Sequence, residues 1–127
     1  MAVHPSPQLL HALAVILSRD RMPEAVEWCR RARDANPAEP KYAYTLAFFL
    51  NQHGEPEAAI RQLEDTVSRS ADYIDAYVLL ASICESRGER ERAGAVYRRA
   101  LSRDNLPPQT REMLTARLAA VAAGRRR

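Results

Sequence analysis

The chain has 127 residues, of which 46% are hydrophobic and 28% charged, and only four are glycine. This length and composition exclude a disordered tail, a collagen-like fibre and a low-complexity linker, and a domain of this size folds without a disulfide or metal. The formal net charge is +3, which equals the contribution of Arg125, Arg126 and Arg127, so the rest of the chain is neutral. We therefore expect neither nucleic acid nor a membrane surface as the partner, because three arginines anchor only marginally to an anionic surface.

The first predicted element is the apolar run at residues 9–17. It is too short to span a bilayer, and it follows Pro5 and Pro7 instead of the basic segment that opens a secretion signal. The expected location is therefore the cytoplasm, by default. This run is apolar on nearly all sides, which exceeds the stripe of about 100° that a surface helix buries. Such a helix at the end of a repeat stack predicts a homo-oligomer interface, or contact with a further repeat in a longer chain, and Trp28 either extends the patch or is half-buried.

The sequence then repeats at a spacing of 34 residues, which predicts repeated structural units. Residues that recur at this spacing are Leu46 and Leu80, Gly54 and Gly88, and Ala25, Ala59 and Ala93. The windows are 6–39, 40–73 and 74–107, followed by one further helix at 108–122 and a basic tail at 124–127. We interpret residues 1–127 as a single domain.

Each window contains two amphipathic segments, because apolar residues recur three and four positions apart. Gly54 and Gly88 stand where the first segments end, and a glycine suits the left-handed conformation that often follows a helix. Prolines suit the first turns of helices and stand at the starts of the segments, at positions 7, 23, 40, 56 and 108. The pattern predicts seven helices in an all-α, right-handed solenoid of helical hairpins.

The third window contains the residues that suggest a family. They are Tyr77, Leu80, Ala81, Cys84, Gly88, Ala93, Tyr97 and Ala100. This pattern resembles the tetratricopeptide repeat, and the resemblance extends over about residues 6–122. It implies that small residues such as Ala81 and Ala93 lie where paired helices cross, and that the last helix, with Leu114, Leu118 and Val121, caps the stack. The first window departs from the pattern, since Asp20 replaces the glycine and Leu13 a small residue.

Residues that could support catalysis or metal binding are few and scattered. Cys29 and Cys84 each stand in an apolar helical pattern and are interpreted as small buried hydrophobic residues. His4, His11 and His53 form no pair with a cysteine or carboxylate at a catalytic or metal-ligand spacing. We therefore expect no enzymatic activity, no cofactor and no metal.

The resemblance implies a concave groove lined by one face of every first helix. Transferred to this sequence, the groove residues are Leu10, His11, Ala14 and Leu17, then Tyr44, Thr45, Phe48, Asn51 and Gln52, then Asp75, Val78, Leu79, Ser82 and Glu85. A clamp for a peptide carboxylate, as in the family's chaperone co-factors, needs Lys, Arg or Asn at positions that hold Leu10, Ala14, Thr45, Asp75 and Leu79 here. The expected ligand is instead a protein or peptide with apolar anchors, flanked by basic residues that complement Asp75 and Glu85.

Tyr44 and Phe48 carry most of this expectation. They stand four residues apart and thus on one helical face, while Leu46, Phe49 and Leu50 form a core stripe on another. With Val78 and Leu79 they either form a binding surface or pack between neighbouring first helices. The first alternative predicts a protein-interaction module; a self-associating subunit that uses its apolar first helix is the other hypothesis.

Overall fold

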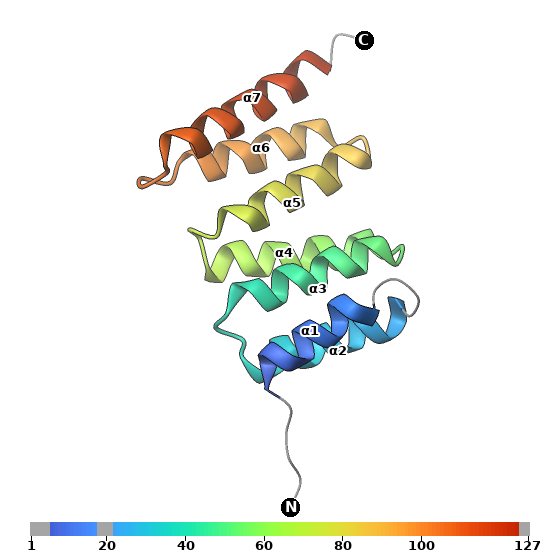
Figure 1. Cartoon of the computed structure of the whole chain (residues 1–127). Coiled ribbons are helices and arrows are strands. Elements are labelled where there is room, and N and C mark those ends of the chain that lie inside the picture. Colours follow the sequence, from blue (N-terminus) through green and yellow to red (C-terminus); the bar gives the residue numbers. More distant parts are fainter. Residues whose placement is uncertain (1–5, 18–21, 125–127) are drawn as a thin grey trace, which may run out of the picture. The chain divides into compact units, whose positions relative to one another are not determined.

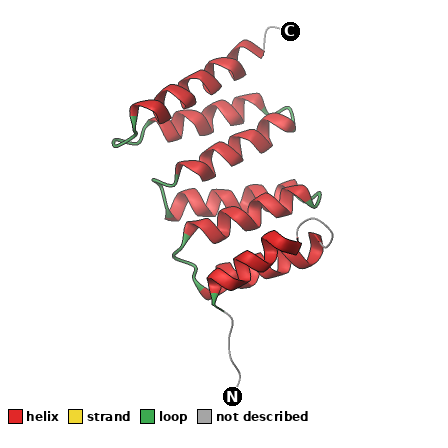
Figure 2. Cartoon of the chain, viewed as in Figure 1, coloured by secondary structure: helices red, strands yellow, loops and turns green. Residues whose placement is uncertain are grey.

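A computed structural model describes residues 6–17 and 22–124, with side chains for 6–12 and 23–124. Within these ranges the chain forms seven helices and no strand, as Figures 1 and 2 show. The helices are α1 (Pro7–Leu17), α2 (Met22–Ala35), α3 (Pro40–Gln52), α4 (Pro56–Arg69), α5 (Ile74–Ser86), α6 (Arg90–Leu101) and α7 (Pro108–Gly124). Each 34-residue window contains two of them, so the predicted all-α class and helix order are confirmed.

The chain divides into two compact units, Met1–Thr66 and Val67–Arg127, with the boundary in the last turn of α4. In the first unit, α2 packs against both α1 and α3. In the second, α6 packs against both α5 and α7. None of the described helices is both long enough and apolar enough to cross a membrane.

The two predicted glycine stops end α3 and α5. Gly54 has a φ of +83° and Gly88 a φ of +79°, a region in which a side chain would be strained. At the end of α3, the Gly54 amide donates to the Asn51 carbonyl at 3.2 Å and the Glu55 amide to the Leu50 carbonyl at 2.9 Å. This pair of bonds is the Schellman motif, which satisfies carbonyl groups left over at a helix end.

Prolines mark the beginnings of most helices. The first residues of α1, α3, α4 and α7 are prolines, and Pro23 is the second residue of α2. A proline at this point costs no hydrogen bond, since the first amides of a helix have no partner within it. The starts predicted at positions 7, 23, 40, 56 and 108 are therefore confirmed.

Small residues are buried where the paired helices meet. Ala25 and Ala59 in the first unit, and Ala81 and Ala93 in the second, have no exposed surface. Larger side chains, among them Leu63 and Tyr97, fill the surrounding core. In α7, Leu114 and Val121 are buried and Leu118 is half-buried, so one face of this helix covers α6, as expected for a capping helix.

Candidate partner-binding surfaces

Leu10 lies in the core of the first unit and not on a groove. Its side chain is only 3% exposed, and it forms a hydrophobic cluster with Ala32 of α2 and Tyr42 of α3, against which Trp28 packs. The expectation that Leu10 contacts a partner was therefore wrong: α1 turns this side chain toward the two helices beside it. Ala14 and Leu17, the other α1 positions expected in the groove, lie outside the described side chains.

His11 and Thr45 connect α1 to α3. The Thr45 hydroxyl donates to the Lys41 carbonyl at 2.9 Å, so its oxygen accepts the second bond, from His11 Nε2 at 2.9 Å. Partial burial, and secondly the positive charge of Lys41, lower the pKa of His11 below its ordinary value. The neutral imidazole is therefore the form that this site favours; its ring centroid lies 5.7 Å from that of Tyr42.

Phe48 of α3 lies at the surface. Its side chain is 39% exposed, whereas Leu46, Phe49 and Leu50 on the other faces of α3 are at most 6% exposed. The Phe48 and Phe49 rings form a T-shaped pair, with centroids 5.6 Å apart and planes at 69°. Phe48 thus rests on the core without entering it. Such an arrangement leaves an aromatic face available to a partner at little cost in conformational freedom.

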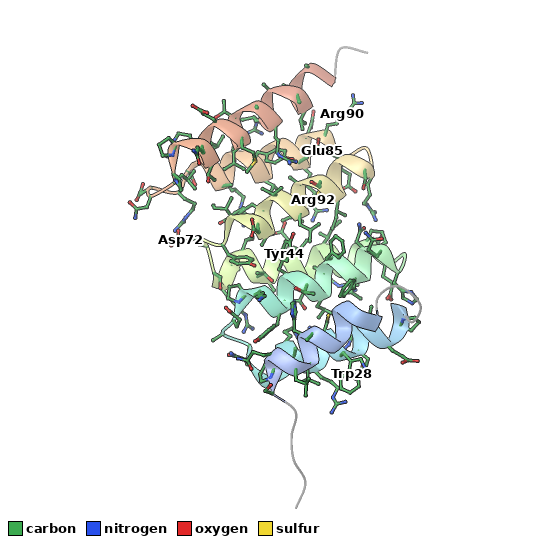
Figure 3. The ribbon with its side chains drawn as sticks, viewed as in Figure 1. Trp28, Tyr44, Asp72, Glu85, Arg90 and Arg92 are labelled. Atoms are coloured by element: carbon green, nitrogen blue, oxygen red, sulfur yellow. The ribbon has the colours of Figure 1, made fainter. Side chains whose placement is uncertain are left out.

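The other predicted residues of α3 surround Phe48 along the helix. Tyr44, Thr45 and Asn51 are half-buried, and Gln52 is exposed. Figure 3 shows Tyr44 on α3. We define the α3 surface as Tyr44, Phe48, Asn51 and Gln52; Thr45 is left out because its hydroxyl is already bonded.

The predicted residues of α5 lie in the second unit. Val78, Leu79 and Ser82 are half-buried, and Asp75 and Glu85 are exposed. We define these five residues as the α5 surface. It offers a partly apolar strip with carboxylates near both ends of the helix.

Glu85 has a structural role that the sequence did not reveal. One of its carboxylate oxygens accepts a hydrogen bond of 2.7 Å from the hydroxyl of Tyr97 on α6. The Tyr97 side chain has no exposed surface. Burial first, and then the Glu85 carboxylate, raise the pKa of Tyr97; a hydrogen bond from Arg117 of α7 opposes this. The only signal in the sequence was that a core tyrosine needs a partner for its hydroxyl.

The apolar arc of α1 is described only in part. Leu9 is 50% exposed, and Leu10 is buried. Residues 13–17 lie outside the described side chains, so the exposed patch on α1 stays a prediction. Trp28 is half-buried against the Leu10 cluster and has the Arg31 guanidinium 4.8 Å from its ring centroid, so it belongs to the packing of the first unit (Figure 3).

Both cysteines are buried, as predicted. Both Cys29 and Cys84 have no exposed surface, and burial raises the pKa of the Cys29 thiol to about 12, which suppresses the reactive thiolate. Across the described residues, no three His, Cys, Asp or Glu side chains are grouped as ligands for a metal ion.

Comparisons with known proteins identified a related family and solved structures with a similar arrangement of helices. Residues 51–109 match a family described as "Tetratricopeptide repeat". Curated protein sequences gave no match. The crystal structure of MamA is similar, with 26% identity and a TM-score of 0.68 over 76% of this chain and 57% of that one. The chain therefore spans a little over half the length of that protein.

Two further solved structures cover nearly all of this chain and contain peptides. One is the first TPR of Spaghetti (RPAP3) bound to the HSP90 peptide SRMEEVD, with 16% identity and a TM-score of 0.77 over 96% of this chain and 97% of that one. The other is the Yersinia enterocolitica type III secretion chaperone SycD with a peptide of the translocator YopD, with 14% identity and a TM-score of 0.77 over 93% of both chains. These similarities confirm the helical-repeat fold.

Proposed function

We propose that the chain, whose residues 51–109 match the tetratricopeptide repeat family, is a non-enzymatic interaction module that binds a protein or peptide through the α3 surface of its first unit, and that the α5 surface of its second unit is another interaction surface. The fold and the family support a protein-interaction role in general. The two structurally similar domains with bound peptides make a peptide segment the favoured kind of partner.

Phe48 is the single observation that carries this proposal. In the described residues, only Leu9 and Phe48 are exposed among large hydrophobic residues. Aromatic side chains on a rigid helix are frequent anchors of protein interfaces. Phe48 therefore supports a partner that inserts apolar side chains beside it.

The polar residues indicate the charge of the partner. Asp75 is exposed in the first turn of α5, and Glu85 retains an exposed carboxylate beside its bond to Tyr97. Neither surface contains Lys or Arg. Basic residues of a partner would thus be attracted to the α5 surface, and high salt would weaken that attraction.

The experiment is capture from a cell lysate by the immobilised chain, followed by measurement of the affinity of each captured protein. Phe48→Ala should weaken the binding free energy of the partner by about 2 kcal/mol or more, because the aromatic anchor is removed. Gln52→Ala, at the exposed edge of the same surface, should cost less. Capture with unchanged affinity by folded Phe48→Ala protein would refute the proposal.

A stability measurement separates lost binding from lost folding. Because Phe48 is partly exposed, Phe48→Ala should change the unfolding free energy much less than Phe49→Ala, whose ring is 6% exposed. Truncating a buried phenylalanine costs about 3 to 5 kcal/mol. If Phe48→Ala lowered the unfolding free energy as much as Phe49→Ala, Phe48 would be a residue of the core and not a binding residue.

A further inference from the structure

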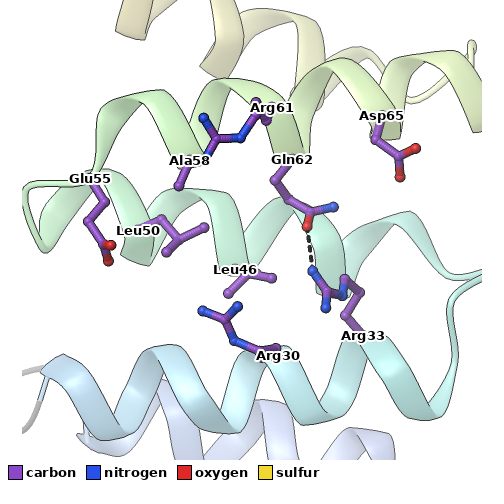
Figure 4. Close-up of a pocket in the computed structure, with 9 residues that line it drawn as sticks. All are labelled: Arg30, Arg33, Leu46, Leu50, Glu55, Ala58, Arg61, Gln62 and Asp65. Atoms are coloured by element: carbon purple, nitrogen blue, oxygen red, sulfur yellow. Dashed lines mark hydrogen bonds between the residues drawn. The ribbon is translucent and has the colours of Figure 1, made fainter.

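A hollow in the first unit lies on a different face from the α3 surface. It has a volume of about 390 Å³, lies between α2 and α4, and has α3 as its floor (Figure 4). The floor is formed by Leu46 and Leu50, which are 1% and 5% exposed. This volume falls within the range of pockets that hold ligands, about 300 to 1,000 Å³. None of the residues proposed to bind the partner of the α3 and α5 surfaces lines the hollow.

One arginine forms a fixed wall of this α2–α4 hollow. Arg33 of α2 donates from Nη1 to Gln62 Oε1 of α4 at 2.6 Å, and from Nε and Nη2 to Asp34 Oδ1 at 3.0 and 2.7 Å. Figure 4 shows the bond from Arg33 to Gln62 across the hollow. Three of its five N–H donors are occupied in this way, so Arg33 mainly shapes the hollow.

Two other arginines have donors to spare. Among the described residues, the Arg61 guanidinium of α4 has no hydrogen bond or ion pair. Arg30 of α2 has only a distant, solvent-exposed contact, with 3.8 Å between its Nε and Glu27 Oε2. Both side chains line the hollow. Guanidinium groups bind carboxylates with paired, charge-assisted hydrogen bonds, so the two arginines provide an anion-binding element above an apolar floor.

The carboxylates of the hollow restrict which anion fits. Glu55 and Asp65 lie at its two ends, with Arg30 between them (Figure 4). A polyanion such as a nucleic-acid backbone would bring its charges past these carboxylates, and like charges in contact are costly. A single carboxylate between Arg30 and Arg61 does not have to pass the carboxylates at the two ends of the hollow.

We propose that the α2–α4 hollow binds a peptide segment of a partner protein in which one acidic side chain stands next to apolar side chains. The carboxylate bonds to Arg30 and Arg61, and the apolar side chains cover Leu46 and Leu50. Glu55 repels a second acidic residue at its end of the hollow. Because the hollow shares no residue with the α3 and α5 surfaces, each can bind without the other.

The test uses the whole chain and a fluorescein-labelled peptide of sequence Gly-Gly-Glu-Leu-Leu-Gly-Gly, with binding followed by fluorescence anisotropy. We expect saturable binding that Arg30→Gln combined with Arg61→Gln weakens about tenfold or more, since bonds to a charged group are lost. Glu55→Gln should strengthen binding, because it removes a repelling charge. The matched control is Arg87→Gln with Arg92→Gln, which removes the same charge from arginines that pair with Glu89 in the second unit.

Several results would overturn this assignment. One is the absence of saturable binding, and another is equal affinity for a peptide with lysine in place of glutamate. A peptide with glycines in place of the leucines that binds as tightly would exclude a role for the apolar floor. If Phe48→Ala abolishes binding while the Arg30 and Arg61 variant keeps it, the peptide occupies the α3 surface instead. Circular dichroism and urea unfolding of each variant establish that it is folded.

Discussion

Replacing Ala93 by leucine tests why small residues stand at the helix crossings. Ala93 has no exposed surface, and its helix α6 packs against both α5 and α7. At the next residue, a methyl group built on Gly94 would lie 3.6 Å from Leu118 of α7, so that helix already approaches closely. Leucine adds three carbon atoms to a site that has no space for them. Overpacking of this kind costs about 1 to 3 kcal/mol.

The control is the same substitution two residues further along the same helix. Ala95 is exposed, and leucine is nearly as good a helix former as alanine, so Ala95→Leu should change the unfolding free energy by less than about 0.5 kcal/mol. Urea unfolding followed by circular dichroism measures both variants. For a loss of about 2 kcal/mol, the Ala93→Leu midpoint should fall by about 1 M. Equal midpoints for the two variants would refute the steric argument.

Two further predictions concern α1. The pKa of His11 is lowered in the folded state, so the unfolded state binds the proton more readily. The unfolding free energy is therefore highest above the ordinary histidine pKa of about 6.5 and decreases as the pH falls below that value. The unfolding free energy should therefore decline between about pH 7.5 and pH 5.5, and more steeply than in His11→Gln; equal slopes would exclude His11 as the cause. If α1 mediates self-association, Leu9→Glu should abolish the dimer seen by sedimentation while Gln8→Glu, with the same charge change, keeps it. A wild-type chain that is monomeric at every concentration would rule out this interface.

The positions of the helices followed from the sequence because their signals are local. A glycine accepts positive φ, as at Gly54 and Gly88, and a proline tolerates the start of a helix, as at Pro40 and Pro56, whatever lies elsewhere in the chain. The 34-residue period added the order of the units. Phe48 was also predictable as a surface residue, because α3 has a separate core stripe through Leu46 and Phe49.

The roles of Leu10, His11 and Glu85 required the tertiary structure. A helix that is apolar on all sides has no periodicity that reveals its inner face, so only packing against Ala32 and Tyr42 placed Leu10 in the core. The partners of the two polar side chains, Thr45 for His11 and Tyr97 for Glu85, are 34 and 12 residues away and become neighbours only through the packing of helices.

The α2–α4 hollow depends on the same kind of information. Arg30, Leu46 and Arg61 belong to three helices, and each resembles an ordinary surface or core residue within its own helix. Periodicity describes one helix at a time, whereas a binding site requires side chains from several helices at defined distances. Helix positions were therefore determined by the sequence itself, and the grouping of side chains into sites was decided by how the helices pack.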